Sequence, residues 1–292
     1  MFRSCTIALF LLASGAVGLG SSANAAASGH SEQRLSRITI RSVGTGSPVV
    51  LIPGLASPAA VFDEVAAKIG SRHRLILVQV NGFAGAAPGA APLDGLIPGA
   101  VDELAGWLAA NHIQKPPVIG HSMGGLMAMM LAKRHPEAAG RLMVVDSLPF
   151  YGMLFGPGAT PDAVRPIVEQ MRAALVSGAT PPQVPPHMSN SDAGKAKILG
   201  WLKTSDNKTV GEALVEDATT DVRPDLPALA GRPVTVVYAV SDSGMKAMAA
   251  GLYGEAYKGL PGVKLVPVDG SEHFIMLDQP AKFDEAVETF LG

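Results

Sequence analysis

The sequence predicts an α/β protein whose mostly parallel sheet is covered by helices on both faces. Short apolar runs of strand length alternate with segments that are apolar at helical spacing along most of the 292 residues. Such alternation is typical of a doubly wound parallel sheet. In addition, a Gly-x-Ser-x-Gly pentapeptide stands where one expected strand gives way to a helix.

Each element follows from its own pattern. Continuous apolar runs such as "PVVLIPG" indicate buried strands, and a proline at the start or end of a periodic segment marks a helix boundary. The expected strands are 34–44, 47–54, 74–82, 116–122, 140–147, 232–242 and 263–270. The expected helices are 58–70, 99–113, 123–136, 161–178, 193–207, 244–260 and 280–292.

Residues 148 to about 230 interrupt the alternation because they contain no convincing strand pattern. The two helices expected there are separated by the Pro-rich stretch 179–191. We therefore expect a helical lid inserted between two late strands. Several of its apolar side chains should attach it to the sheet or line a pocket: Phe150, Tyr151, Met153, Leu154, Phe155, Met171, Leu175, Met188 and Trp201.

The first 25 residues have the pattern of a cleavable signal peptide. Arg3 precedes an apolar run that is short for a membrane span, and Ala23-Asn24-Ala25 fits the small-x-small cleavage rule. The alternative is an N-terminal membrane anchor. We expect a single domain over 26–292, located in a periplasm or outside the cell.

Composition excludes several classes of function. Cys5 is the only cysteine, so no zinc cluster, disulfide framework or thiol nucleophile is expected in the mature chain. The net charge is −2 and no basic stripe is present, which argues against a nucleic-acid partner. No later apolar run could span a membrane stably. The sequence does not indicate an oligomeric state.

The segment Gly120-His121-Ser122-Met123-Gly124 predicts a nucleophilic serine. In this motif the serine occupies a tight, strained turn between a strand and a helix. The residues two before and two after it approach so closely that side chains would clash, which explains the glycines. The turn should raise the Ser122 hydroxyl above the sheet edge.

A serine nucleophile needs a base and an acid, which follow this motif in the order Ser, acid, His. His273 is the expected base because it follows the last strand, whereas His187 lies in the Pro-rich stretch. Asp242, at the end of the preceding strand, is the expected acid. Asp146, which ends the strand before that, is the alternative.

The tetrahedral intermediate of acyl transfer also needs hydrogen-bond donors for its oxyanion. The backbone N–H of Met123 is expected to be one donor because it begins a helix. The N–H of Leu55, in the loop after "PVVLIPG", is expected to be the second.

These motifs resemble the α/β-hydrolase superfamily, in particular its lid-bearing serine esterases. "LIPGLAS" is similar to the oxyanion loop, "GHSMGG" to the nucleophile elbow, "VVYAVSD" to the acid turn and "SEHFIMLDQPAKF" to the histidine loop. The resemblance implies hydrolysis without a metal or organic cofactor, and no HExxH, CxxC or GxGxxG motif is present. Two departures are Ala239, where the acid turn usually has Gly, and Pro53-Gly54, where the oxyanion loop usually has His-Gly.

The expected function is hydrolysis of a small-to-medium apolar or aryl ester through an acyl-enzyme on Ser122. The alternatives are an amide, lactone or carbon–carbon bond hydrolase with the same triad, and a non-catalytic binding protein on the same scaffold. Fold and triad do not separate the hydrolytic reactions.

Overall fold

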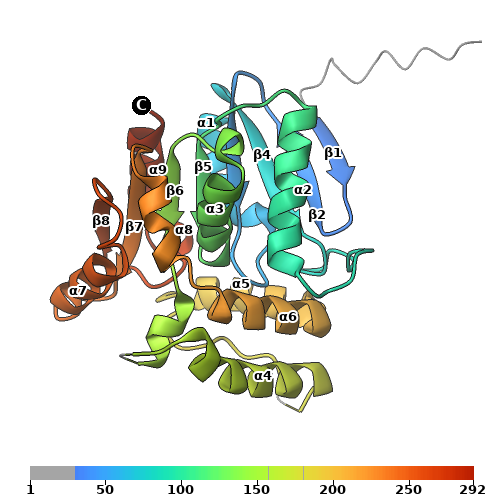
Figure 1. Cartoon of the computed structure of the whole chain (residues 1–292), viewed down its shortest axis with the longest axis vertical. Coiled ribbons are helices and arrows are strands. Elements are labelled where there is room, and N and C mark those ends of the chain that lie inside the picture. The colour runs from blue at the N-terminus through green and yellow to red at the C-terminus, as the bar shows by residue number, and fades with distance from the viewer. Residues whose placement is uncertain (1–29, 157, 180) are drawn as a thin grey trace, which may run out of the picture.

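The computed structural model describes residues 30–156, 158–179 and 181–292. The predicted signal peptide lies outside these residues. An eight-stranded sheet forms the centre of the described chain (Figure 1). Its strands are β1 (His30–Arg34), β2 (Ile38–Val43), β3 (Ser47–Ile52), β4 (His73–Val80), β5 (Val118–His121), β6 (Leu142–Val145), β7 (Val234–Val240) and β8 (Lys264–Asp269).

The sheet is parallel except at one edge. Its strand order is β1-β2-β4-β3-β5-β6-β7-β8. The pairs β1–β2 and β2–β4 are antiparallel, and every other pair is parallel. The strand predicted at 34–44 corresponds to β2, whereas β1 was not predicted, and both strands belong to the antiparallel edge.

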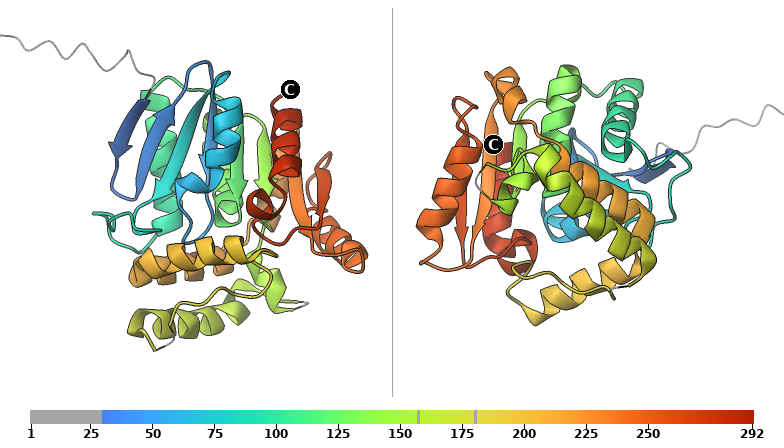
Figure 2. Two further views of the ribbon diagram at one scale, coloured as in Figure 1. Left: turned by 180° about the vertical axis from the view of Figure 1, so that it is seen from behind. Right: turned by 60° about the horizontal axis from the view of Figure 1, so that its bottom comes forward.

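Helices cover both faces of the sheet, as the sequence predicts. In Figure 1, α2 and α3 lie in front of the sheet, and the reverse view in Figure 2 brings α1 and α9 forward. The α-helices that follow the strands are α1 (Asp63–Ile69), α2 (Leu96–Ala110), α3 (Met123–Arg134), α7 (Lys246–Ala256), α8 (Ile275–Asp278) and α9 (Pro280–Leu291). The 3₁₀ helices are η1 (Ala59–Phe62), η2 (Pro136–Ala138), η3 (Tyr151–Phe155) and η4 (Arg223–Leu229).

Alternation along the strands creates two hydrophobic cores. In β3, Val50 and Ile52 join the core that includes α2 and α3, whereas Val49 and Leu51 join the core that includes α1 and α9. All four side chains are fully buried. Burial on both faces explains why this strand reads as a continuous apolar run rather than as an alternating one.

Between β6 and β7, residues 148–230 form the helical insertion. It contains α4 (Pro161–Ser177), α5 (Asp192–Thr204) and α6 (Asn207–Thr219), and these helices lie across the carboxyl ends of the parallel strands (Figures 1 and 2). The helix α6 was not predicted. It packs between α4 and α2, and its N-terminus is capped by Asp206, which accepts a hydrogen bond from Thr209 N at 2.8 Å.

None of the helices in the described ranges is both long enough and apolar enough to cross a membrane.

Candidate active site

Ser122 occupies the strained turn that the sequence predicts. It follows β5 directly, with φ 55° and ψ −125°, a region that residues with a side chain rarely adopt. A Cβ atom on Gly120 would lie 2.1 Å from the carbonyl oxygen of Gly124. A Cβ on Gly124 would lie 2.2 Å from the carbonyl oxygen of Ile52. Both glycines are therefore required by the close approach of backbone segments at this turn.

The loop after β3 passes equally close to the serine. A Cβ on Gly54 would lie 2.9 Å from Ser122 Cβ and 3.1 Å from His121 Nδ1. The next residue, Leu55, lines the cavity in front of Ser122, and its N–H donates none of the hydrogen bonds found among the described residues.

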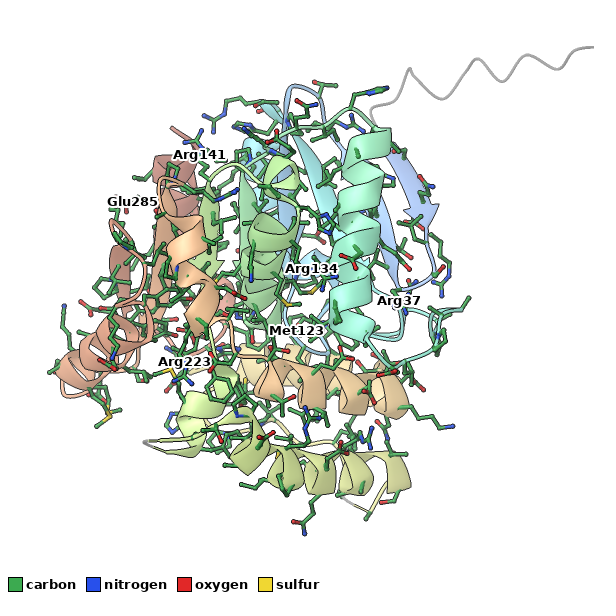
Figure 3. The ribbon with its side chains drawn as sticks, viewed as in Figure 1. Arg37, Met123, Arg134, Arg141, Arg223 and Glu285 are labelled. Atoms are coloured by element: carbon green, nitrogen blue, oxygen red, sulfur yellow. The ribbon has the colours of Figure 1, made fainter. Side chains whose placement is uncertain are left out.

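Met123 is the first residue of α3, so its backbone N–H has no acceptor within the helix. Figure 3 places Met123 at the end of α3 that lies nearest the helical insertion. Leu55 lines the cavity that Ser122 also lines and Met123 begins α3, while the role of their N–H groups as oxyanion donors stays a prediction.

His273 and Asp146 form the central hydrogen bond of the site. His273 Nδ1 lies 2.7 Å from Asp146 Oδ2, which leaves Nε2 as the ring nitrogen available on the other side. Ser122 and His273 both line the same two cavity lobes, although Ser122 Oγ and the His273 ring are not hydrogen-bonded to each other in this structure. In unliganded enzymes such bonds often tighten only when substrate is present.

Asp146 is held in place from three sides. Its φ of 44° turns it out of the line of β6, a conformation that aspartate tolerates better than most residues. Besides accepting from His273, its carboxylate accepts hydrogen bonds from Ala239 N at 2.7 Å and from Tyr253 OH at 3.0 Å. Burial by itself would raise the pKa of Asp146, but the hydrogen bond and charge of His273, assisted by Ala239 N–H, hold that pKa below its ordinary value.

Asp242, the acid chosen from the sequence, is not beside His273, and this choice was wrong on the geometry. Its side chain is exposed and its Oδ1 accepts hydrogen bonds from the N–H groups of Gly244 at 2.7 Å and Met245 at 3.2 Å. Asp242 therefore caps the turn that leads into α7. The alternative named from the sequence, Asp146, occupies the position beside the histidine.

His121 supports the backbone of His273. The ring of His121 is fully buried, its Nε2 lies 3.0 Å from the carbonyl oxygen of His273, and the two ring centroids are 4.7 Å apart. Burial first, and then the neighbouring His273, lower the pKa of His121 to about 3. A neutral His121 therefore donates Nε2–H to this carbonyl and takes a hydrogen-bonding role.

The Pro-rich stretch of the helical insertion is joined to the histidine loop by backbone hydrogen bonds. His273 N–H donates to His187 O at 3.0 Å, and Phe274 N–H donates to Met188 O at 2.9 Å. Asp278 holds the same stretch because its Oδ1 accepts from Ser189 Oγ at 2.6 Å. Residues 187–190 thus form a strap that borders His273.

The cavity at the site has two lobes that meet at Ser122. One lobe, of about 120 Å³, is mainly apolar and extends toward α5, where Ile198, Trp201 and Leu202 line it. The other, of about 450 Å³, extends toward α7. Six residues line both lobes and so define the junction between them: Ser122, Tyr151, Pro185, Met188, Asp217 and His273.

The apolar residues that the sequence assigned to the helical insertion have divided roles. Tyr151 and Met188 border the junction, Trp201 lines the small lobe and Leu154 lines the large one. Phe150 is fully buried in a small core of the insertion, whereas Met171 is half exposed and lines neither lobe.

Sequence reasoning missed Asp217, which lies on the unpredicted helix α6. Its side chain is only 6% exposed. Burial raises the pKa of Asp217 to about 7, against the opposing effect of His273. The cap at Asp206, three residues before Thr209, was the signal that could have revealed the helix.

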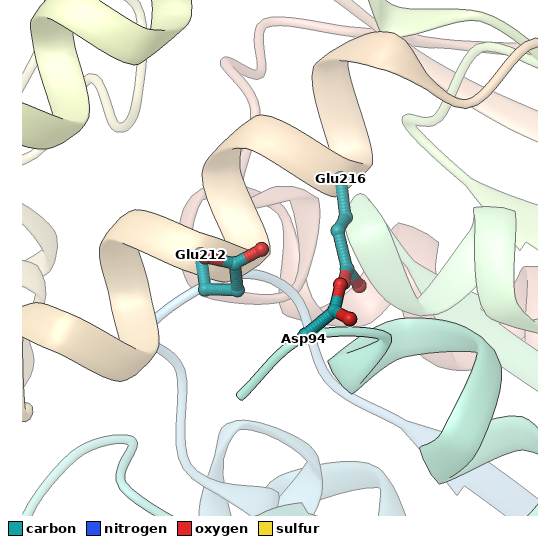
Figure 4. Close-up of side chains that lie close together, drawn as sticks. All are labelled: Asp94, Glu212 and Glu216. Atoms are coloured by element: carbon teal, nitrogen blue, oxygen red, sulfur yellow. The ribbon is translucent and has the colours of Figure 1, made fainter. Parts of the chain in front are cut away.

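A second acidic group lies away from this cavity. Asp94, Glu212 and Glu216 bring one carboxylate oxygen each within 4.8 Å of one another (Figure 4). Glu216 already accepts hydrogen bonds from the N–H groups of Leu96 and Ile97, the first residues of α2. Glu216 is therefore the cap that ties α6 to α2, and this group lines neither lobe of the cavity.

The fold, the serine turn and the His–Asp pair agree with a comparison against known families, in which the model of the "Alpha/beta hydrolase family" matches residues 49–286. The chain belongs to the α/β hydrolase family. It is 27% identical over 267 residues to the pimeloyl-(acyl-carrier protein) methyl ester esterase of Aeromonas hydrophila, with 87% of this chain and 99% of that protein covered. It is 25% identical to the N-formylmaleamate deformylase of Pseudomonas putida, with 86% and 91% covered.

Among solved structures, a thermophilic esterase from Thermogutta terrifontis has the same fold, with a TM-score of 0.68 at 20% identity and with 89% of this chain and 98% of that chain covered. The chain is therefore a hydrolase of the α/β fold with esterase-like relatives.

Proposed function

We propose that the protein is a serine esterase that cleaves small-to-medium apolar or aryl carboxylic esters through an acyl-enzyme on Ser122. The observation that carries this proposal is the 2.7 Å hydrogen bond between His273 Nδ1 and Asp146 Oδ2 at a cavity that Ser122 also lines. This is the arrangement in which an acid orients a histidine toward a serine hydroxyl.

In the first half of the reaction, Ser122 Oγ attacks the ester carbonyl while its proton passes to His273 Nε2. Asp146 fixes the ring and stabilises the imidazolium that forms. The negative oxygen of the tetrahedral intermediate is held by Leu55 N–H and Met123 N–H, each of which contributes about 3 kcal/mol of transition-state stabilisation. The C–O bond to the alcohol then breaks, and the alcohol leaves with the proton from His273.

In the second half, a water molecule attacks the acyl-enzyme while His273 accepts one of its protons. The bond between the acyl carbon and Ser122 Oγ breaks, and His273 returns the proton to the serine. The net reaction converts an ester and water into a carboxylic acid and an alcohol, so no redox partner is required.

The cavity supports the expected substrate class. A small apolar lobe and a larger lobe meet at the serine, which suits an ester with one compact apolar group on one side of the scissile bond. Long polymeric or multiply charged substrates do not fit the small lobe.

The test is to incubate wild-type protein and Ser122→Ala with a fluorophosphonate probe and to measure hydrolysis of p-nitrophenyl esters of increasing acyl length. We expect Ser122 to be labelled only in wild type, with kcat/KM highest for short acyl chains. Folded wild-type protein that is neither labelled nor active would instead be a non-catalytic binding protein.

Amide hydrolysis is the second candidate because one relative at 25% identity is a deformylase of N-formylmaleamate. The same serine, histidine and acid would carry out this reaction, with an amine as the leaving group. Matched ester, lactone and amide substrates with the same acyl group would separate the two candidates by their kcat/KM values.

We further propose that the mature protein acts in a periplasm or outside the cell, since residues 1–25 have a signal-peptide pattern. N-terminal sequencing of the protein from its native host should give a start near Ala26. A start at Met1 would contradict this proposal.

A further inference from the structure

The cavity junction has a polar group on each side. The strand end contributes Ser122 and the histidine loop contributes His273, while the helical insertion contributes the carboxyl group of Asp217 from α6. Tyr151, from η3, borders the same junction. A substrate whose reacting carbonyl lies at Ser122 would therefore place neighbouring atoms against Asp217.

Asp217 has no hydrogen-bond partner among the described residues, although only 6% of the residue is exposed. A buried carboxyl without a partner is unfavourable, and such groups in folded proteins are normally hydrogen-bonded. The carboxyl oxygens are nevertheless not sealed off, since the side chain lines both lobes. The partner they lack can therefore come from a molecule that enters the cavity.

The residues around Asp217 limit which chemical groups of a ligand could be its partner. Most of the other residues around the small lobe are apolar, among them Ile198, Trp201, Leu202, Leu214 and Phe274. A carboxyl group in such a setting discriminates strongly between a ligand that supplies a hydrogen-bond donor and one that does not, because the mismatched complex leaves the buried group unpaired. An anionic ligand group would be repelled whenever the carboxyl is ionised.

We propose that Asp217 is a specificity-determining residue that accepts a hydrogen bond from a hydroxyl or N–H group which the substrate carries close to its scissile carbonyl. The preferred substrates would then be hydroxy- or amino-type esters rather than plain alkyl esters. This inference rests on the proposed esterase function. It is supported by the raised pKa of Asp217, which burial causes and which a donor from the substrate would bring back down.

The experiment compares esters that differ only in the donor. On the acyl side, p-nitrophenyl butyrate, 3-hydroxybutyrate and 3-methoxybutyrate are hydrolysed by wild type, Asp217→Leu and Asp217→Asn. On the alcohol side, 2-hydroxyethyl and 2-methoxyethyl butyrate are followed by pH-stat titration. The control variant is Glu212→Gln, which lies on the same helix but pairs with Arg172 outside the cavity.

We expect wild type to prefer the hydroxy ester over its methoxy partner by about tenfold in kcat/KM in one of the two series. The ratio should fall to about one or below in Asp217→Leu, should be partly retained in Asp217→Asn because its carbonyl still accepts, and should be unchanged in Glu212→Gln.

If wild type hydrolyses the hydroxy and methoxy esters equally well in both series, the proposal is wrong, and no variant is needed to show this. The proposal also fails if Asp217→Leu lowers the rates of all esters equally, since Asp217 would then act through His273 rather than on the substrate. Neither result affects the proposed esterase function, which fails only if wild type hydrolyses none of these esters and is not labelled at Ser122.

Discussion

The sheet edge and the helical insertion face each other across the same cavity but are built differently. On the sheet side, Asp146 accepts hydrogen bonds from His273, Ala239 and Tyr253, and His121 holds the backbone of the histidine. On the insertion side, the wall is mostly apolar, and the carboxyl group of Asp217 has no hydrogen-bond partner in the part of the chain that the structure describes.

Under the proposed esterase function, this difference separates the groups that carry out the reaction from the groups that select the substrate. Groups that must act on any substrate are pre-ordered by strands and by strained turns, so they need no reorganisation when the substrate arrives. The group that we propose selects substrates, Asp217, lies on a helical segment inserted between strands, where sequence can change without disturbing the sheet. Substitutions on the two sides of the cavity should therefore differ in their effects on rate and on stability.

The two candidate acids provide the strongest test of the sheet side. Asp146→Asn should reduce kcat by about 10⁴-fold, because the amide favours the wrong histidine tautomer and no longer stabilises the imidazolium. Asp242→Asn should change kcat by no more than about twofold, since it alters only an exposed turn. Steady-state kinetics on one p-nitrophenyl ester decide the matter, and a larger loss in Asp242→Asn would reverse the assignment.

A pair of glycine substitutions compares the packing of the two sides. Gly54→Ala would push a methyl group to 2.9 Å from Ser122 Cβ, and displacing the serine by about 1 Å should lower kcat by about 10²-fold. Gly200→Ala, in α5, has open space around the added methyl and should raise the unfolding free energy by about 1 kcal/mol.

Kinetics and urea denaturation of both glycine variants provide the measurement. Equal loss of activity in the two variants would contradict the division between a rigid sheet edge and a tolerant insertion.

Tyr253→Phe should have a smaller effect on the sheet side, about tenfold in kcat, because it deletes one of the three hydrogen bonds to Asp146. Tyr257→Phe is the matched control, since its hydroxyl donates to Ser147 O and not to the acid. Tyr257→Phe should lower stability with little change in kcat. If the role of Tyr253 is only structural, Tyr253→Phe will instead leave kcat unchanged and lower only the melting temperature.

Asp217→Asn should give the smallest effect on the hydrolysis of esters that carry no hydroxyl or N–H donor, and its effect on such esters should be seen in stability rather than in rate. The folded-state pKa of Asp217 is about 7 and its ordinary value is 3.8, so between these values the folded protein binds more protons than the unfolded chain. The wild type therefore loses unfolding free energy as pH rises through this window.

The melting temperature of Asp217→Asn relative to wild type should accordingly be higher at pH 8 than at pH 4. Differential scanning fluorimetry at both values measures this, with Glu212→Gln as the control that should show no such change. If the difference in melting temperature between Asp217→Asn and wild type is the same at pH 4 and pH 8, the pKa of Asp217 is not raised in the folded protein.

The parts of the site that depend on local sequence could be predicted. A glycine on each side of Ser122 and the strand before it are sufficient to indicate the turn, because the clash that forces it involves only neighbouring segments. His273 was expected at the site from its place after the last strand, and the structure places it beside Asp146. The parallel sheet followed from continuous apolar runs such as that of β3.

The choice of acid could not be made locally. Asp146 and Asp242 both follow apolar strands, and what separates them is the positive φ of Asp146 together with partners from β7 and α7, more than 90 residues later. Asp217 was missed because α6 is only weakly apolar overall, and its burial comes from packing between α4 and α2.

The strap at residues 187–190 has a consequence for how substrates reach the serine. The backbone of the strap accepts hydrogen bonds from His273 N–H and Phe274 N–H. A movement of the strap away from the sheet would therefore also move the imidazole of His273 away from Ser122. An opening that left this segment in place, between η3 and α7 where Leu154 and Met248 are exposed, would admit a molecule with the proton relay still assembled. An opening that moved the strap would, in contrast, displace His273 each time the cavity opened.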